Sequence, residues 1–268
     1  MFQLFSTNSK TGYSYDFGIC PLMKENSSGK FKAFCGVDKC YSVQRLNSHR
    51  GKHLQNKLNR IPELLGFLES EVKILNALHG AKDILVRGFS FGDYMPEFRE
   101  EFLYILRNLQ TRHIIISKTL WLMAPELVEE SGNKTELSLG FTKQLYPKFK
   151  KFLSEYSGLK FSIAFTYAKL DELEWLKSVD PGLLQKVDVL HDEYIHFTKG
   201  RQFSRYKETQ EFTKSAIGMQ RNFKKHLAEL SEIHPNAGTR QCNIWGVDQK
   251  IKACADCVGC GTISRRSP

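Results

Sequence analysis

Four cysteines near the C-terminal end are the residues whose type and spacing indicate chemistry most directly. Eleven residues separate Cys242 from Cys254. Cys254, Cys257 and Cys260 follow one another with two residues between each consecutive pair. Thiolates at this spacing can turn toward one point from a tight loop, and two neighbouring glycines permit the positive φ angles of such a loop. Short C-x2-C-x2-C runs hold iron–sulfur clusters in ferredoxins, and four thiolates can also hold zinc. The spacing therefore predicts a metal or cluster site, and the alternative is a disulfide pair plus free thiols.

Three further cysteines lie near the N-terminal end. Cys20 directly follows an aromatic alternation over residues 13–17, which is typical of a strand, and Cys35 and Cys40 follow it after gaps of 14 and four residues. Residues 41–241 contain no cysteine, so all seven lie at the two ends of the chain. Taken together, both groups are candidate metal ligands.

The rest of the composition suggests a reducing compartment. No apolar run approaches the roughly 20 residues of a membrane span, and residues 1–10 are too polar for a secretory signal. We therefore expect a cytoplasmic protein with no membrane partner, in which clustered cysteines favour metal or redox chemistry over structural disulfides.

The charge balance favours an anionic partner. The chain carries 39 Lys and Arg against 29 Asp and Glu, a formal net charge of +10. This suits a nucleic acid or a nucleotide, and residues 41–60 are notably basic. Because the basic residues are otherwise spread along the chain, a soluble surface with a basic bias is the alternative.

The hydrophobic pattern predicts an α/β fold. Apolar strands are expected at 13–17, 84–91, 113–116, 161–165 and 187–190, and helices at 62–79, 96–109, 146–156 and 171–178. This alternation predicts a parallel sheet covered on both faces, curled into a partial or complete (β/α) barrel over residues 1–200. Residues 201–268 are predicted to form a charged helix and a Cys-rich, cluster-binding extension packed on the barrel.

Polar residues follow the predicted strands at the edge where α/β sheets place their chemistry. The strand ends carry Cys20, Gly92-Asp93, Ser117-Lys118, Thr166-Tyr167 and His191-Asp192-Glu193. We take Asp93 and Lys118 as candidate catalytic residues. Singly, each position could be an ordinary strand-end turn, and Asp93 could be a helix N-cap.

These pieces resemble a known family. The strand leading into a cysteine loop with Cys40-Tyr41, the segment Val86-Arg-Gly-Phe-Ser-Phe-Gly92-Asp93, the segment Ser117-Lys-Thr119 and the Cys-rich tail resemble phage-encoded, largely uncharacterised iron–sulfur gene products. That family is in turn similar to radical-SAM enzymes, and the resemblance covers most of the chain.

The resemblance implies a radical-SAM-like barrel and its cofactors. Cys20, Cys35 and Cys40 would hold a [4Fe-4S] cluster, and Asp93 would stand near the Glu of the Gly-Gly-Glu-type turn that binds the amino group of S-adenosylmethionine. Cys242, Cys254, Cys257 and Cys260 would hold a second, auxiliary cluster. The spacing C-x14-C-x4-C differs from the radical-SAM spacing C-x3-C-x2-C, and Gly-Asp stands where those enzymes have Gly-Gly-Glu.

Three functions follow. The first is an iron–sulfur protein performing redox or radical chemistry on a nucleotide or nucleic acid. The second is a zinc-stabilised nucleic-acid-binding module without catalysis. The third is a redox-inert structural phage protein whose cysteines join the two ends of the chain.

Overall fold

The computed structural model describes residues 4–8, 12–37, 43, 47, 64–79, 84–89, 92–132, 135–167 and 170–192. Its strands are β1 (Ser6–Asn8), β2 (Gly12–Tyr15), β3 (Met23–Glu25), β4 (Phe31–Ala33), β5 (Leu85–Gly88), β6 (Arg112–Ser117), β7 (Glu136–Phe141), β8 (Ser162–Tyr167) and β9 (Val189–Asp192). Its helices are α3 (Leu64–His79), the 3-10 turn η1 (Pro96–Phe98), α4 (Arg99–Asn108), α5 (Leu120–Met123), α6 (Pro125–Ser131), α7 (Tyr146–Glu155), α8 (Leu170–Val179) and α9 (Pro181–Lys186). The predicted second region, residues 201–268, lies outside the described residues.

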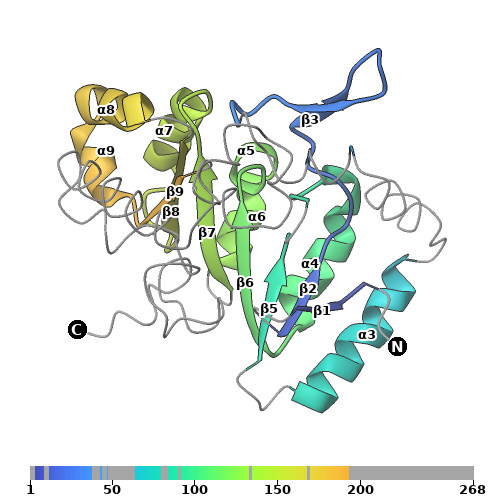
Figure 1. Ribbon diagram of the computed structural model, residues 1–268. Coiled ribbons are helices and arrows are strands. Elements are labelled where there is room, and N and C mark those ends of the chain that lie inside the picture. Colours follow the sequence, from blue (N-terminus) through green and yellow to red (C-terminus); the bar gives the residue numbers. More distant parts are fainter. Residues whose placement is uncertain are drawn as a thin grey trace, which may run out of the picture.

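A seven-stranded sheet forms the centre of the fold (Figure 1). Its strand order is β1-β2-β5-β6-β7-β8-β9, and every neighbouring pair is parallel except β1 with β2. The predicted parallel α/β sheet is therefore confirmed. Each parallel strand of this sheet lies beside the next one along the chain, so the sheet is wound in one direction, as in (β/α) barrels. Among the described strands, β1 and β9 are the outer ones.

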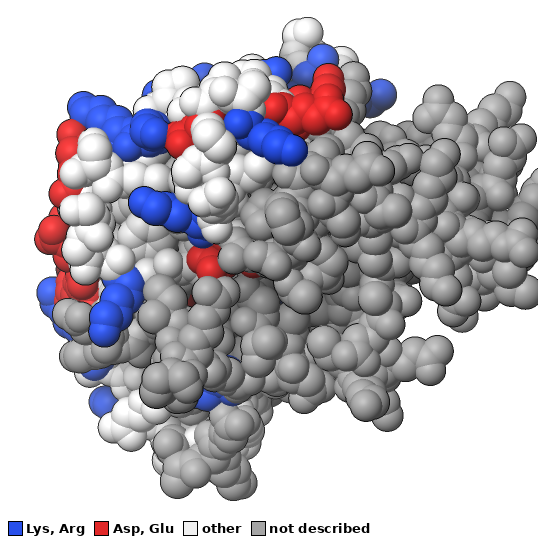
Figure 2. Space-filling model, turned by 90° about the vertical axis from the view of Figure 1, so that its left-hand side faces the viewer, with Lys and Arg blue, Asp and Glu red and all other residues white. Residues whose placement is uncertain are grey.

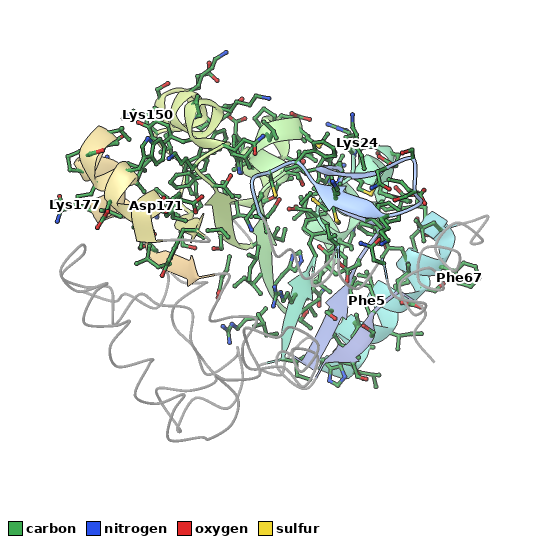
Figure 3. The ribbon with its side chains drawn as sticks, turned by 45° about the horizontal axis from the view of Figure 1, so that its top comes forward. Phe5, Lys24, Phe67, Lys150, Asp171 and Lys177 are labelled. Carbon is green, nitrogen blue, oxygen red and sulfur yellow. The ribbon has the colours of Figure 1, made fainter. Side chains whose placement is uncertain are left out.

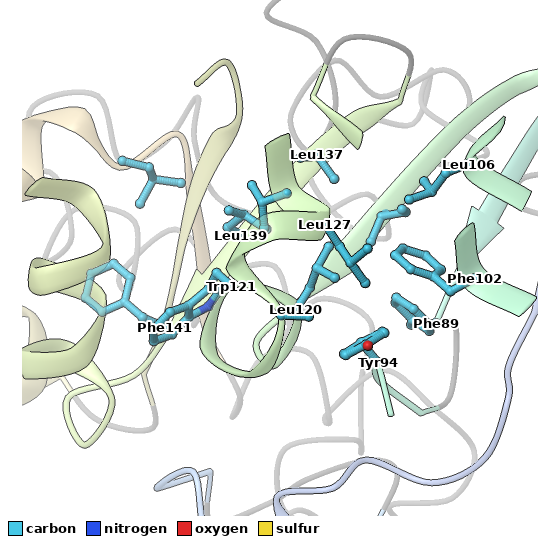
Figure 4. Packing of buried hydrophobic residues seen from close by; sticks show 14 of the residues in the cluster. Phe89, Tyr94, Phe102, Leu106, Leu120, Trp121, Leu127, Leu137, Leu139 and Phe141 are labelled. Carbon is cyan, nitrogen blue, oxygen red and sulfur yellow. The ribbon is translucent and has the colours of Figure 1, made fainter. Parts of the chain in front are cut away.

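One face of the sheet carries the main hydrophobic core (Figure 4). Side chains alternate between the faces of a strand, and one alternate set, represented by Val86, Ile115, Leu139 and Phe165, packs with the helices. Leu85, Ile114, Ala164 and Val189 belong to the other set and are buried outside that cluster. We expected helices on both faces, whereas the described helices pack on one. We refer to the opposite face as the inner face.

A small second sheet projects from this body. Strands β3 and β4 pair antiparallel, with Lys24 opposite Lys32, and Figure 1 shows them extending away from the large sheet. The side chain of Asn26 organises the turn, since its Oδ1 accepts hydrogen bonds from the backbone N–H groups of Ser28 and Lys30 at 3.1 and 2.9 Å. The sequence predicts no strand over residues 24–32, because Lys, Ser and Gly are poor strand formers.

Between β6 and α7, where the sequence predicts no helix or strand, the structure contains α5, α6 and β7. Helices α5 and α6 lead into β7, whose Leu137, Leu139 and Phe141 point into the core. Trp121 fixes α5 on this strand, because its Nε1 donates to the carbonyl oxygen of Gly140 at 2.9 Å.

In the part of the chain that the structure describes, no helix is long and apolar enough to span a bilayer.

Candidate functional site

The β3–β4 hairpin carries two of the predicted cysteine ligands, one on each of its arms. The backbone N–H of Phe34 donates to the carbonyl oxygen of Leu22 at 2.7 Å, so the pairing continues one residue beyond the strands. The pair formed by Leu22 and Phe34 is the base of the hairpin. Cys20 and Cys35 lie just outside this base, one on each arm. The 14 residues that separate them in sequence are therefore folded away into the hairpin, and the long spacing is compatible with a shared site.

The arm that carries Cys20 lies against the end of β5. A Cβ atom on Gly92 would stand 2.4 Å from the carbonyl oxygen of Gly18, so only glycine permits this approach. The backbone N–H of Gly92 also donates to Oδ1 of Asp16 at 2.7 Å, which ties the turn to the end of β2. Phe89, between β5 and this turn, has a φ of 59°, an uncommon backbone conformation for a bulky residue that often occurs near functional sites.

The arm that carries Cys35 lies against the end of β7. The hydroxyl group of Thr142 donates to the carbonyl oxygen of Cys35, and Cys35 is only 5% exposed. A Cβ atom on Gly36 would stand 3.0 Å from the side chain of Gln144, which follows the same strand. Both described cysteines thus lie at the carboxyl edge of the parallel sheet, the position predicted for the chemistry.

The remaining cysteine predictions lie outside the described residues. They concern Cys40, Cys242, Cys254, Cys257 and Cys260. Within the described part of the chain, no group of three or more His, Cys, Asp or Glu residues is arranged to hold a metal ion. Two of the seven candidate ligands can be placed, and they lie on the two arms of one hairpin.

Asp93 joins the ends of two neighbouring strands. Its Oδ1 accepts from the hydroxyl group of Ser117 at 2.5 Å and from the backbone N–H of Tyr94 at 2.8 Å. Its Oδ2 accepts from the backbone N–H of Lys118 at 2.9 Å. Asp93 is 7% exposed, so this carboxylate connects the β5 turn to the start of α5. The contacts describe a residue that positions this corner of the sheet.

Lys118 extends across the inner face. Its stem passes over Gly140 on β7, where a Cβ atom would stand 3.1 Å from Lys118 Cγ and 3.6 Å from its Cε. Glycine at this position therefore leaves the path for the lysine. Sequence reasoning identified Lys118, and the structure places its stem on the inner face at the carboxyl ends of the strands.

Small polar residues accompany Lys118 on that face. Ser138 and Ser162 are neighbours in the β7–β8 register, and Thr166 lies further along β8. The hydroxyl oxygens of Ser138 and Thr166 are buried and have no hydrogen-bond partner among the residues that the structure describes, and the same is true of Nε of Arg87 on β5. Because buried polar groups usually have partners, these atoms mark a surface suited to a polar ligand.

A separate polar group lies on the helix-covered face. The hydroxyl group of Tyr15 passes over Gly88 and lies 2.9 Å from Nε2 of His113, whose Nδ1 is 3.2 Å from Oγ1 of Thr135. Burial lowers the pKa of His113 to about 3 and raises that of Tyr15 well above its usual value. His113 is thus a neutral, hydrogen-bonded core residue near neutral pH.

The surface charge is mixed on one side of the molecule. Figure 2 shows Lys and Arg side chains interspersed with Asp and Glu over the described part of the side on which α8 and α9 lie. Two of the contacts there are the ion pair of Lys150 with Asp180 and the cation–π contact of Lys143 with the Trp175 ring at 5.0 Å. The excess of positive charge in the sequence therefore gives no uniform basic surface here.

Comparison with known proteins adds no assignment. No protein-family model, curated protein or solved structure matches the chain.

Proposed function

We propose that the chain is an iron–sulfur protein whose first cluster is held by Cys20, Cys35 and Cys40 at the carboxyl edge of the parallel sheet. The observation that supports this most is the hairpin, whose two arms carry Cys20 and Cys35. The four tail cysteines Cys242, Cys254, Cys257 and Cys260 have the spacing for a second cluster.

The surroundings of the two described cysteines fit such a group. Cys35 is buried and Cys20 is half-buried, beside the apolar Met23 and Phe31. A low-dielectric environment influences the reduction potential of a cluster. A [4Fe-4S] cluster supplies one-electron chemistry.

We infer a barrel-like enzyme with the substrate on its inner face. The one-directional winding of the sheet supports a radical-SAM-like partial barrel, and the Gly92 turn lies directly against the Cys20 arm, as a site for S-adenosylmethionine requires. Lys118 and the unpartnered hydroxyl groups of Ser138 and Thr166 would bind the substrate. An ammonium group there favours an anionic substrate such as a nucleotide.

Anaerobic purification of the full chain, followed by iron, acid-labile sulfide and zinc analysis, tests the proposal. We expect a brown protein with about four or eight iron atoms per chain, equal amounts of sulfide and broad visible absorption. Electron spin resonance of the reduced protein, with and without S-adenosylmethionine, then shows whether the cofactor binds the cluster. A colourless protein with stoichiometric zinc contradicts the proposal and favours the zinc-stabilised nucleic-acid-binding module.

The tail cluster has its own test. Cys257→Ser is expected to lower the iron content while leaving iron bound at the N-terminal site. Full iron content in this variant would remove Cys257 from the ligands.

A further inference from the structure

The outward face of the β3–β4 hairpin carries a compact set of basic and aromatic side chains. Side chains alternate along a strand, so Lys24 on β3 shares a face with Lys30, Lys32 and Phe34 on and beside β4. All four are exposed, and 52% of Phe34 is accessible to solvent. Met23 and Phe31, on the opposite face, are buried against the body of the protein.

The outward face lowers the stability of the hairpin when no ligand is bound to it. Lys24 and Lys32 are direct cross-strand partners, and like charges at opposed positions destabilise a hairpin. The nearby carboxylate, Glu25, is opposite Phe31 and so belongs to the other alternate set. An anion bound between the lysines would relieve their repulsion.

The aromatic ring makes the anion's chemistry more specific. Nζ of Lys24 lies 5.9 Å from the centre of the Phe34 ring, so a positive charge and an accessible ring lie side by side. Single-stranded nucleic acids are bound by surfaces of this kind, on which the phosphates contact lysines and an unpaired base stacks on the ring. In a duplex the base faces are already stacked, which favours a single strand as the partner.

The hairpin is rigid enough to present these side chains. Oδ1 of Asn47 accepts from the backbone N–H of Phe31 at 2.8 Å, and Nδ2 of Asn47 donates to the carbonyl oxygen of Phe31 at 3.2 Å. These bonds hold the free edge of β4, while Asn26 fixes the turn. Figure 3 labels Lys24 on the β3–β4 hairpin.

We propose that the outward face of the β3–β4 hairpin, formed by Lys24, Lys30, Lys32 and Phe34, binds single-stranded nucleic acid. The phosphates contact the three lysines, and one base stacks on Phe34. The hairpin base carries Cys20 and Cys35, so the bound strand lies beside the carboxyl edge of the sheet. This inference holds whether or not the cysteines bind iron.

Fluorescence anisotropy of the full chain with a labelled single-stranded 20-mer tests the lysines. The triple variant Lys24→Gln, Lys30→Gln and Lys32→Gln is expected to weaken binding roughly ten- to hundredfold at 0.1 M salt and to reduce the slope of log K against log salt by about two. The control is the equally charged triple variant Lys73→Gln, Lys148→Gln and Lys160→Gln, whose lysines are exposed elsewhere.

The contribution of the Phe34 ring to nucleic-acid binding is tested separately. Phe34→Ala is expected to weaken binding about five- to hundredfold with an unchanged salt slope, because it removes base stacking and no charge. Phe67→Ala is the matched control, since Phe67 on α3 is 40% exposed and lies on another element. Equal losses in the hairpin and control variants, a preference for the duplex 20-mer, or binding to phosphatidylserine vesicles in place of the oligonucleotide would overturn the proposal. Iron content, measured in the same samples, is expected to stay at the wild-type value.

Discussion

Gly92 lies so close to Gly18 that a Cβ atom at position 92 would stand 2.4 Å from the Gly18 carbonyl oxygen. This contact joins the turn after β5 to the arm that carries Cys20. It makes the position of a candidate ligand depend on a residue that is not itself a ligand.

Gly92→Ala will therefore displace the Cys20 arm. We expect the iron content of the anaerobically purified protein to fall by at least half while the circular dichroism spectrum stays close to that of the wild type. Gly158→Ala is the control, because a Cβ atom there meets nothing within 4 Å. A Gly92→Ala protein with full iron content would separate the turn from the metal centre.

Asp93→Asn will destabilise the protein by about 1–3 kcal/mol. The buried carboxylate accepts hydrogen bonds from Ser117, Tyr94 and Lys118, and an amide cannot accept all three without turning an NH2 group toward a donor. Urea unfolding measures this loss, with the exposed Glu129→Gln as control. An unchanged free energy of unfolding would argue against a positioning role and favour direct cofactor binding by Asp93.

His113 will make the protein less stable in acid. Burial lowers its pKa from 6.5 to about 3, so below pH 6.5 the unfolded chain binds a proton that the folded chain does not. The free energy of unfolding should fall by about 1.4 kcal/mol per pH unit from this group, or about 2 kcal/mol between pH 6.5 and 5.

His113→Gln keeps an amide that can bond to Tyr15 and Thr135, and it removes this titration. The slope of the unfolding free energy against pH should be shallower in the variant below pH 6.5 and equal to that of the wild type above pH 7.5. Parallel curves over the whole range would show that His113 does not titrate as its burial implies.

Lys118→Met will change stability by less than about 0.5 kcal/mol, because the aliphatic stem over Gly140 is retained. Binding of AMP, used as the anionic probe in isothermal titration calorimetry, should weaken at least tenfold, since a charged hydrogen bond is lost. Lys151→Met, on the exposed side of α7, serves as control. Unchanged AMP binding would remove Lys118 from the ligand site.

The sheet could be predicted because its strands are local apolar runs. Strands β2, β5, β6, β8 and β9 overlap the predicted segments, and helices α3, α4, α7 and α8 overlap the helices predicted between residues 62 and 178. The missed strand β7 alternates Leu137, Leu139 and Phe141 with Ser138 and Gly140, a period-two signal that is short and weakened by glycine. Whether the sheet closes as a barrel depends on long-range pairing, which a local pattern does not encode.

The sequence predicted that the candidate residues lie at the carboxyl edge of the sheet, but it predicted only part of their arrangement there. Strand-end reasoning identified Cys20, Asp93 and Lys118, and all three lie at the carboxyl edge. The hairpin between Cys20 and Cys35 was missed, because its lysines, serines and glycine are typical of a loop and its pairing depends on burial of Met23 and Phe31. Thr166 was among the predicted strand-end residues, whereas Ser138 had no signal beyond the alternation of small polar residues.

The most direct measurement of the central claim is the iron and acid-labile sulfide content of the anaerobically purified double variant Cys20→Ser and Cys35→Ser, compared with the wild type. The account predicts that about four iron atoms and four sulfides per chain are lost, with the remaining cluster held by the tail cysteines. Wild-type iron and sulfide in a folded double variant would contradict it.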